Sequence, residues 1–226
     1  MTSSHPRRRR LRYPVTITFL MVLAAVGLAT GSAWQRLPHL VIHQAGFRPS
    51  DALAFDLGRL LGAAWFTTDP VSLAQALVLT ALGVGWLERR AGSVWAATAF
   101  VGLHLASFLG VVALYLMPFT HGLVRDVRDV GASAGYFGAL AVVVAMTPRW
   151  RWLAAFAALA AVGAWLGSVA AQGVLGRDVN AAAEHAVAWL LGGTVGWIAG
   201  VRQRARTQLA QATREPPAQA GTDRQS

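Results

Sequence analysis

Long apolar segments alternate with short polar ones along most of the 226-residue chain. A membrane core about 30 Å thick is crossed by roughly 20 apolar residues in a helix. Six segments approach or reach this length and are predicted to be membrane-spanning helices: 13–33, 71–87, 93–116, 131–147, 150–172 and 181–201. The pattern therefore predicts an all-α membrane protein in which residues 13–201 form a six-transmembrane-helix bundle.

The composition agrees with a membrane protein. Hydrophobic residues make up 55% of the chain and charged residues 13%, about half the charged fraction of an ordinary soluble domain. A disordered protein is excluded, because disorder requires low hydrophobicity and high charge. The chain has no cysteine, which excludes a disulfide scaffold, a thiol enzyme and a zinc-thiolate site. No metal or other cofactor is expected.

All 20 basic residues are arginines, and their positions orient the predicted helices. Fourteen fall in the segments 1–12, 88–90, 149–151 and 202–226, which lie on one side of a six-helix bundle, and six lie on the other side. Cytoplasmic loops carry the excess of arginine and lysine, so both termini are expected to be cytoplasmic. This topology explains the net charge of +10. No nucleic-acid partner is expected, because the arginines do not gather on one soluble face.

Three segments lie outside the predicted helices or connect them. Residues 1–12 form a basic cytoplasmic tail, and residues 202–226 are polar and predicted to be a disordered cytoplasmic tail. The first external loop, 34–70, contains amphipathic pieces that are expected to lie in the membrane interface. The first helix with the small residues at 29–33 also fits a cleaved signal peptide, which is the alternative for that segment.

A serine and a histidine are the candidate chemical groups. The fourth predicted helix opens with GASAG at 131–135, and the sixth opens with AEH at 183–185. Ser133 and His185 are then expected at similar depth, just below the external surface. Such a pair is the minimum for a nucleophile activated by a base. The alternative is structural: Ser133 packs between helices, and His185 hydrogen-bonds a backbone carbonyl. Glu184 is expected at the interface, because neighbouring helical residues point about 100° apart.

Small residues predict close contact between the fourth and sixth helices, because they let helix backbones approach. The sixth helix carries an unbroken ridge of such residues, Ala188, Gly192, Gly196 and Gly200. The residues expected to pack at this contact and around Ser133 are Gly131, Gly135, Gly138, Ala188 and Gly192. Tight packing there would bring the hydroxyl and the imidazole together.

At these residues the chain resembles the rhomboid family of intramembrane serine proteases. The sequence GASAGYFGALA at 131–141 resembles the motif of that family around its nucleophile, and His185 with Ala188 and Gly192 fits the spacing after its catalytic histidine. Two further similar segments are LERRAGS at 87–93 and FDLGRLLGAAWFTTDP at 55–70. The resemblance implies a six-helix fold with cytoplasmic termini, in which Ser133 is the nucleophile and His185 the general base.

The second helix departs from the family pattern. Rhomboids usually carry His-x-x-x-Asn there to help bind the oxyanion, whereas this chain has Ser72 and Ala76 at those places, with Gln75 one residue away. Loss of one oxyanion donor costs about 10²–10³ in rate. Ser72 and Gln75 are the candidate replacements. The order Ala134-Gly135 also inverts the usual Gly-Ala of the motif.

The expected function is intramembrane proteolysis of single-span membrane proteins in the cell membrane. The first alternative is a weakened or inactive rhomboid-like protein that binds membrane clients without cleaving them. An unrelated six-helix transporter comes third, because a transporter is expected to carry ionisable groups at the membrane midplane, and only His104 comes close to that position.

Overall fold

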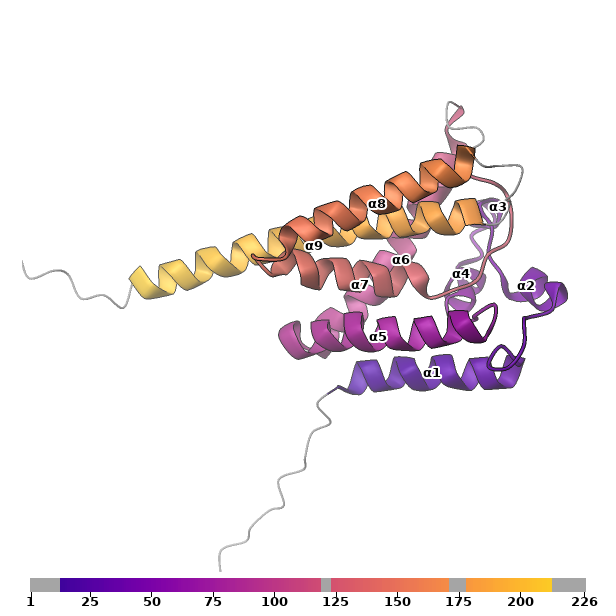
Figure 1. The fold of residues 1–226 in the computed structure, drawn as a ribbon, viewed down its shortest axis with the longest axis horizontal. Coiled ribbons are helices and arrows are strands. Elements are labelled where there is room, and N and C mark those ends of the chain that lie inside the picture. Colours follow the sequence, from indigo (N-terminus) through magenta and orange to yellow (C-terminus); the bar gives the residue numbers. More distant parts are fainter. Residues whose placement is uncertain (1–12, 119–122, 171–177, 213–226) are drawn as a thin grey trace, which may run out of the picture.

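The computed structural model describes residues 13–118, 123–170 and 178–212, which are mostly helical and contain no strand. Figure 1 shows the main helices side by side in one bundle. The helices are α1 (Pro14–Thr30), α2 (His39–Ala45), α3 (Pro49–Leu53), α4 (Leu57–Ala63), α5 (Pro70–Ala91), α6 (Ser93–Leu116), α7 (Ser133–Met146), α8 (Arg151–Ala170) and α9 (Asp178–Ala212). The prediction of an all-α fold is confirmed for these residues.

Each of the six apolar segments overlaps one of the longer helices, namely α1, α5, α6, α7, α8 and α9, of which α5 and α9 extend beyond their segments at both ends. Helices α5, α6 and α8 are long and apolar enough to cross a membrane, whereas α1 and α7 are apolar but shorter. The three remaining helices, α2, α3 and α4, all lie within the segment predicted as the first loop.

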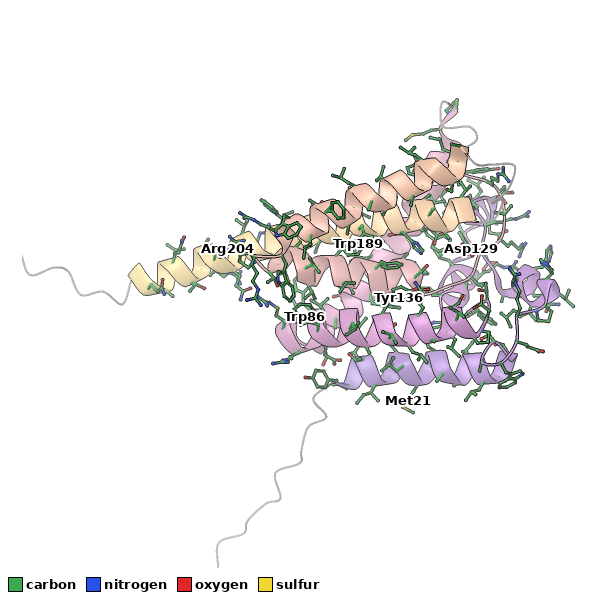
Figure 2. All side chains as sticks on the ribbon, viewed as in Figure 1. Met21, Trp86, Asp129, Tyr136, Trp189 and Arg204 are labelled. Atoms are coloured by element: carbon green, nitrogen blue, oxygen red, sulfur yellow. The ribbon has the colours of Figure 1, made fainter. Side chains whose placement is uncertain are left out.

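The outer surface of the bundle carries many large apolar side chains. Met21 of α1 is 66% exposed (labelled in Figure 2), and Leu159 of α8 is 72% exposed. Exposed apolar surface on this scale is unusual for a soluble monomer and marks a face covered by lipid or protein. With three helices that are long enough to cross a bilayer, it indicates a membrane protein.

Helix α7 lies at the centre of the bundle and contacts α5, α6, α8 and α9 (Figure 1). Glycines of α9 make this possible. A Cβ added at Gly192 would overlap the carbonyl oxygen of Gly138, and one added at Gly196 would overlap that of Val142. Ala188 is fully buried on the same helix. The small residues of α9 therefore allow its backbone to touch that of α7.

Two glycines of α7 leave room for side chains of α6. A Cβ at Gly135 would come within 2.9 Å of the Phe100 ring, and one at Gly138 within 2.7 Å of Leu103. Both contacts are with α6. Gly131 was expected to pack in the fourth helix, but it lies in the segment before α7, where its φ of +148° favours glycine. The reason is that α7 begins only at Ser133.

The buried carboxylate of Glu88 joins three helices where α5 ends and α1 and α6 begin. Glu88, near the end of α5, is 4% exposed. It accepts hydrogen bonds from the backbone N–H groups of Val15 and Thr16 (3.0 and 2.9 Å) and from the hydroxyls of Thr16 and Ser93 (2.6 and 2.7 Å). A carboxylate at a helix N-terminus also interacts favourably with the helix dipole. Glu88 therefore fixes the starts of α1 and α6 to the end of α5.

Helix α9 continues to Ala212 and projects beyond the other helices (Figure 1). Residues 202–212 are helical where the sequence predicted a disordered tail. Arginine, glutamine, alanine and leucine are good helix formers, and they dominate this segment. The polarity of residues 202–212 indicates only that α9 continues beyond the apolar part of the bundle. The predicted tails 1–12 and 213–226 lie outside the described residues.

Candidate active site

A cavity of about 340 Å³ lies at the end of the bundle where α5, α7 and α9 begin. Its walls include Ser133, His185, Ser72 and Gln75, the four residues that the sequence suggested for catalysis and oxyanion binding. They come from three helices that are far apart in the sequence. We call this end of the molecule the cavity end. Asp129, labelled in Figure 2, lies there.

Ser133 is the first residue of α7, and Ala132 is the N-cap residue. The sequence placed Ser133 about three residues inside its helix. The first N–H groups of a helix have no partner within it, and the dipole makes that terminus attractive to negative charge. The observed position therefore puts Ser133 in the first turn of α7, whose N–H groups have no partner within the helix.

The segment before Ser133 is held by the first loop. Phe47 and Asp129 form an isolated antiparallel bridge, with N···O distances of 3.0 and 2.9 Å. The N–H of Gly131 donates to the carbonyl of Ala63 (3.0 Å). Phe47 and Ala63 are themselves almost fully buried. The start of α7 is thus fixed by hydrogen bonds to a part of the chain that precedes α5.

Arg128 strengthens the same connection. Its Nη1 donates to the carbonyls of His43 (2.7 Å) and Gly46 (3.4 Å), and its Nη2 lies 3.7 Å from the Asp51 carboxylate. Arg128 also lines the cavity. A planar guanidinium is suited to several directional bonds at once.

His185 is the eighth residue of α9, because this helix begins at Asp178 and not near residue 181. Its ring packs edge-on against Phe137, with the centroids 4.7 Å apart. Phe137 follows Ser133 by one helical turn, so His185 lies about one turn deeper than the start of α7. Nε2 of His185 is buried and has no hydrogen-bond partner among the described residues. The structure brings Ser133 and His185 to one cavity without a hydrogen bond to Nε2.

Ser72 is already engaged in capping α5. Its backbone N–H donates to Asp69 Oδ1 (2.8 Å) and its hydroxyl to Asp69 Oδ2 (3.0 Å), while Thr68 also donates to Asp69 (2.9 Å). Burial raises the pKa of the Asp69 carboxyl, but these hydrogen bonds lower it by more, so this pKa lies below its usual value. Gln75 is exposed on the cavity wall and is one helical turn from Ser72. Its amide is better placed to meet a ligand.

The cavity also contains residues that sequence reasoning did not identify. Arg36 and the buried Tyr136 line it, as does Arg128. Figure 2 shows Tyr136 between the ribbons of α7 and α5. No local sequence pattern indicates that these residues meet at one cavity. Arg36, for example, belongs to an irregular loop. The two arginines line the cavity together with Asp69 and Asp129, so its walls carry charges of both signs.

Polar residues of α9 around His185 are also buried. Glu184 is 3% exposed, and not at the interface as expected, because the earlier start of α9 places it nearly two turns inside the helix. Asn180 accepts from the N–H of Arg125 (2.9 Å) and donates to its carbonyl (2.7 Å). It thereby fastens the segment before α7 to the start of α9. His104 is buried against Phe108 and does not line the cavity.

Within the described part of the chain, no group of three or more histidine, aspartate or glutamate side chains is arranged to hold a metal ion. No protein-family model matches the chain, and no curated protein is significantly similar to it. The chemistry must therefore be argued from the cavity and its side chains.

Proposed function

We propose that this chain is an intramembrane serine protease of the rhomboid type, which cleaves single-span membrane proteins. One observation carries the proposal: Ser133 and His185 line one cavity, together with the start of helix α7. A hydroxyl, a base and unpaired helix N–H groups are the three components of acyl transfer through an oxyanion. The resemblance of residues 131–141 and 185–192 to the rhomboid motifs supports the same reaction.

In the proposed mechanism, the hydroxyl of Ser133 attacks the scissile carbonyl while His185 takes its proton. His185 then returns this proton to the leaving amine, and water releases the acyl group by the same steps in reverse order. Because Nε2 of His185 has no hydrogen-bond partner among the described residues, the mechanism requires the hydroxyl and the imidazole to approach each other when substrate binds. Such hydrogen bonds often tighten only when substrate binds.

The oxyanion is held by the backbone N–H of Ser133 and by Gln75. Gln75 supplies an amide donor from α5, one residue away from the place where the rhomboid pattern has its asparagine. Ser72 contributes indirectly, because its hydroxyl is committed to Asp69 and stabilises the start of α5. The side chain of Arg36 also lines the cavity.

The proposal places six helices across the cell membrane, with both termini in the cytoplasm. Helix α7 has 14 residues, about 21 Å at 1.5 Å per residue, which is shorter than the bilayer core. This length suffices because α7 is surrounded by other helices and does not face lipid along its length. A reporter fused after Arg206 is expected to be cytoplasmic, and one fused after Asp126 external.

The second candidate is a rhomboid-like protein that binds membrane clients without cleaving them. Two observations favour it: Nε2 of His185 lacks a partner among the described residues, and the Ser72 hydroxyl, which stands where the family has its histidine, is bonded to Asp69. Such a protein would use the same cavity to hold a segment of its client.

Double-mutant kinetics test the proposal. Ser133→Ala and His185→Ala should each abolish cleavage of a single-span reporter substrate in lipid, and the double variant should be no worse, since the two groups act as one unit. Ser107→Ala is the matched control, because this buried hydroxyl donates to Leu103 O (2.7 Å) and does not line the cavity. Folded wild-type protein that cleaves no substrate but retains clients would favour the second candidate.

A further inference from the structure

Charge is unevenly distributed between the two ends of the bundle. Four ion pairs lie at the cavity end, where arginines meet Asp51, Asp56 and Asp126. The opposite end, which we call the arginine end, carries seven described arginines: Arg89, Arg90, Arg149, Arg151, Arg202, Arg204 and Arg206. Its only described carboxylate is Glu88, which is buried and saturated by hydrogen bonds. The arginine end therefore has an excess of positive charge.

A groove of about 840 Å³ opens at this end between the start of α6 and helix α9. On α9 it is lined first by Val195 and Ile198, and then by Arg202 and Arg206. These positions share one face of the helix, because they follow each other at intervals of three or four residues. Trp95 of α6, 51% exposed, forms the other wall. The groove thus has an apolar half and a cationic half.

The order of the two halves matches a lipid that stands in a membrane leaflet. From Ile198 to Arg206 the helix rises about 12 Å. The apolar half continues the lipid-facing surface of α9, where Trp197 is also exposed, and the arginines follow where α9 leaves the bundle (Figure 1). An indole beside this boundary is typical of the membrane interface.

We propose that this groove binds one anionic phospholipid of the cytoplasmic leaflet. Arg202 and Arg206 contact its phosphate and anionic headgroup, and an acyl chain lies along Ile198, Val195 and Trp95. Guanidinium groups bind phosphate through paired hydrogen bonds, and basic pockets between membrane helices are suited to such headgroups. The inference rests on the membrane placement in the proposed function, but not on the chemistry of Ser133.

Arg204 provides an internal comparison. It lies on the same stretch of α9, but it lines a different and smaller groove together with Arg90 and Pro148, and its Nε donates to the carbonyl of Gly200 (3.3 Å). Figure 2 shows Arg204 at the end of the bundle opposite Asp129. A specific site should depend on Arg202 and Arg206 much more than on Arg204, whereas general attraction of anions should depend on all three equally.

Native mass spectrometry of the full-length protein in dodecyl maltoside, titrated with phosphatidylglycerol, tests the proposal. We expect one tightly retained lipid. Each arginine near an anionic headgroup contributes about fivefold in affinity, so Arg202→Gln with Arg206→Gln should weaken binding about 25-fold. Arg204→Gln and Arg59→Gln should change it less than twofold, and Ser133→Ala not at all. Arg59 is paired with Asp56 at the cavity end (3.2 Å).

Tryptophan fluorescence gives an independent readout in the unaltered protein. Phosphatidylglycerol with brominated acyl chains should quench emission, and Trp95→Phe should remove most of the quenching that saturates at one lipid. Three results would overturn the proposal: equal retention of phosphatidylcholine, an equal loss with Arg204→Gln, or equally effective competition by free glycerol phosphate or an acidic peptide. Loss of cleavage activity with lipid binding intact would refute only the proposed protease.

Discussion

Gly192 of helix α9 is in direct backbone contact with helix α7, and its replacement by alanine should push these two helices apart. The added Cβ would overlap the carbonyl oxygen of Gly138 and come within 2.9 Å of the Cβ of Ala141. Ordinary contact begins near 3.4 Å, so relief requires a shift of at least half an ångström at Ala141. The Gly138 carbonyl cannot move freely, because Gly138 is also packed against Leu103 of α6.

The neighbouring Gly193 supplies a matched control. A Cβ added at Gly193 meets no atom within 4 Å. Alanine in place of glycine in a helix gains about 1 kcal/mol of intrinsic helix stability at either position. The difference between the two variants therefore isolates the packing cost, which we expect to be about 1–3 kcal/mol, as for other overpacked cores.

The assay is reversible unfolding of Gly192→Ala and Gly193→Ala in a mixed detergent system, monitored by circular dichroism. Gly192→Ala should unfold at a lower denaturant concentration than wild type, and Gly193→Ala at the same or a higher one. Gly192→Ala should also lower cleavage activity, because α7 and α9 carry Ser133 and His185. Equal stability of the two variants would refute the close contact between α7 and α9 and the approach of the two candidate catalytic residues.

Three other predictions concern residues around the core and the cavity. Thr16→Val should lower the free energy of unfolding by about 1–3 kcal/mol in the same unfolding assay, because it removes a hydroxyl that donates to the buried Glu88 carboxylate. Thr18→Val is the control and should have little effect, because the exposed Thr18 hydroxyl donates to Pro14 O (2.8 Å). Asp69→Asn should lower the free energy of unfolding by less than about 1 kcal/mol, because asparagine also caps a helix but lacks the charge and the second acceptor oxygen that Thr68 and Ser72 bond. Folding lowers the pKa of the Asp69 carboxyl. The contribution of its charge to the free energy of unfolding is therefore complete above the unfolded pKa of about 4 and is lost as the pH falls through the lower folded value. The unfolding curves of wild type and Asp69→Asn should converge in strong acid, and a difference that widens there would contradict this sign. Gln75→Ala should lower kcat of cleavage about 10²-fold, while Ser72→Ala should mainly lower the free energy of unfolding. A large loss of kcat with Ser72→Ala and none with Gln75→Ala would assign the oxyanion contact to Ser72.

The positions of the long helices could be predicted from the sequence, because hydropathy over about 20 residues is a local property. The start of α5 also has a local signal, since Asp69 caps the helix and Pro70 opens it. The length of α9 was underestimated, because the search for apolar residues ends where the arginines begin. Helix propensity in residues 202–212 was the signal that could have corrected it.

The walls of the cavity could be predicted only in part. Ser133 and His185 stood out because polar side chains inside predicted membrane helices are costly and uncommon. The bridge between Phe47 and Asp129 and the bonds of Arg128 to the first loop have no local pattern, because they join segments far apart in the chain. The burial of Glu184 was missed for a similar reason, since it depends on which neighbours cover the start of α9.

Labelling with a serine-directed fluorophosphonate tests the central claim most directly. Wild-type protein in lipid should be labelled at one site, and Ser107→Ala equally so, because the Ser107 hydroxyl is buried and does not line the cavity. Ser133→Ala should not be labelled, and His185→Ala should be labelled far more slowly, since the hydroxyl then lacks its base. Folded wild-type protein that remains unlabelled, or labelling of Ser133→Ala at the wild-type rate, would contradict the assignment of Ser133 as the nucleophile.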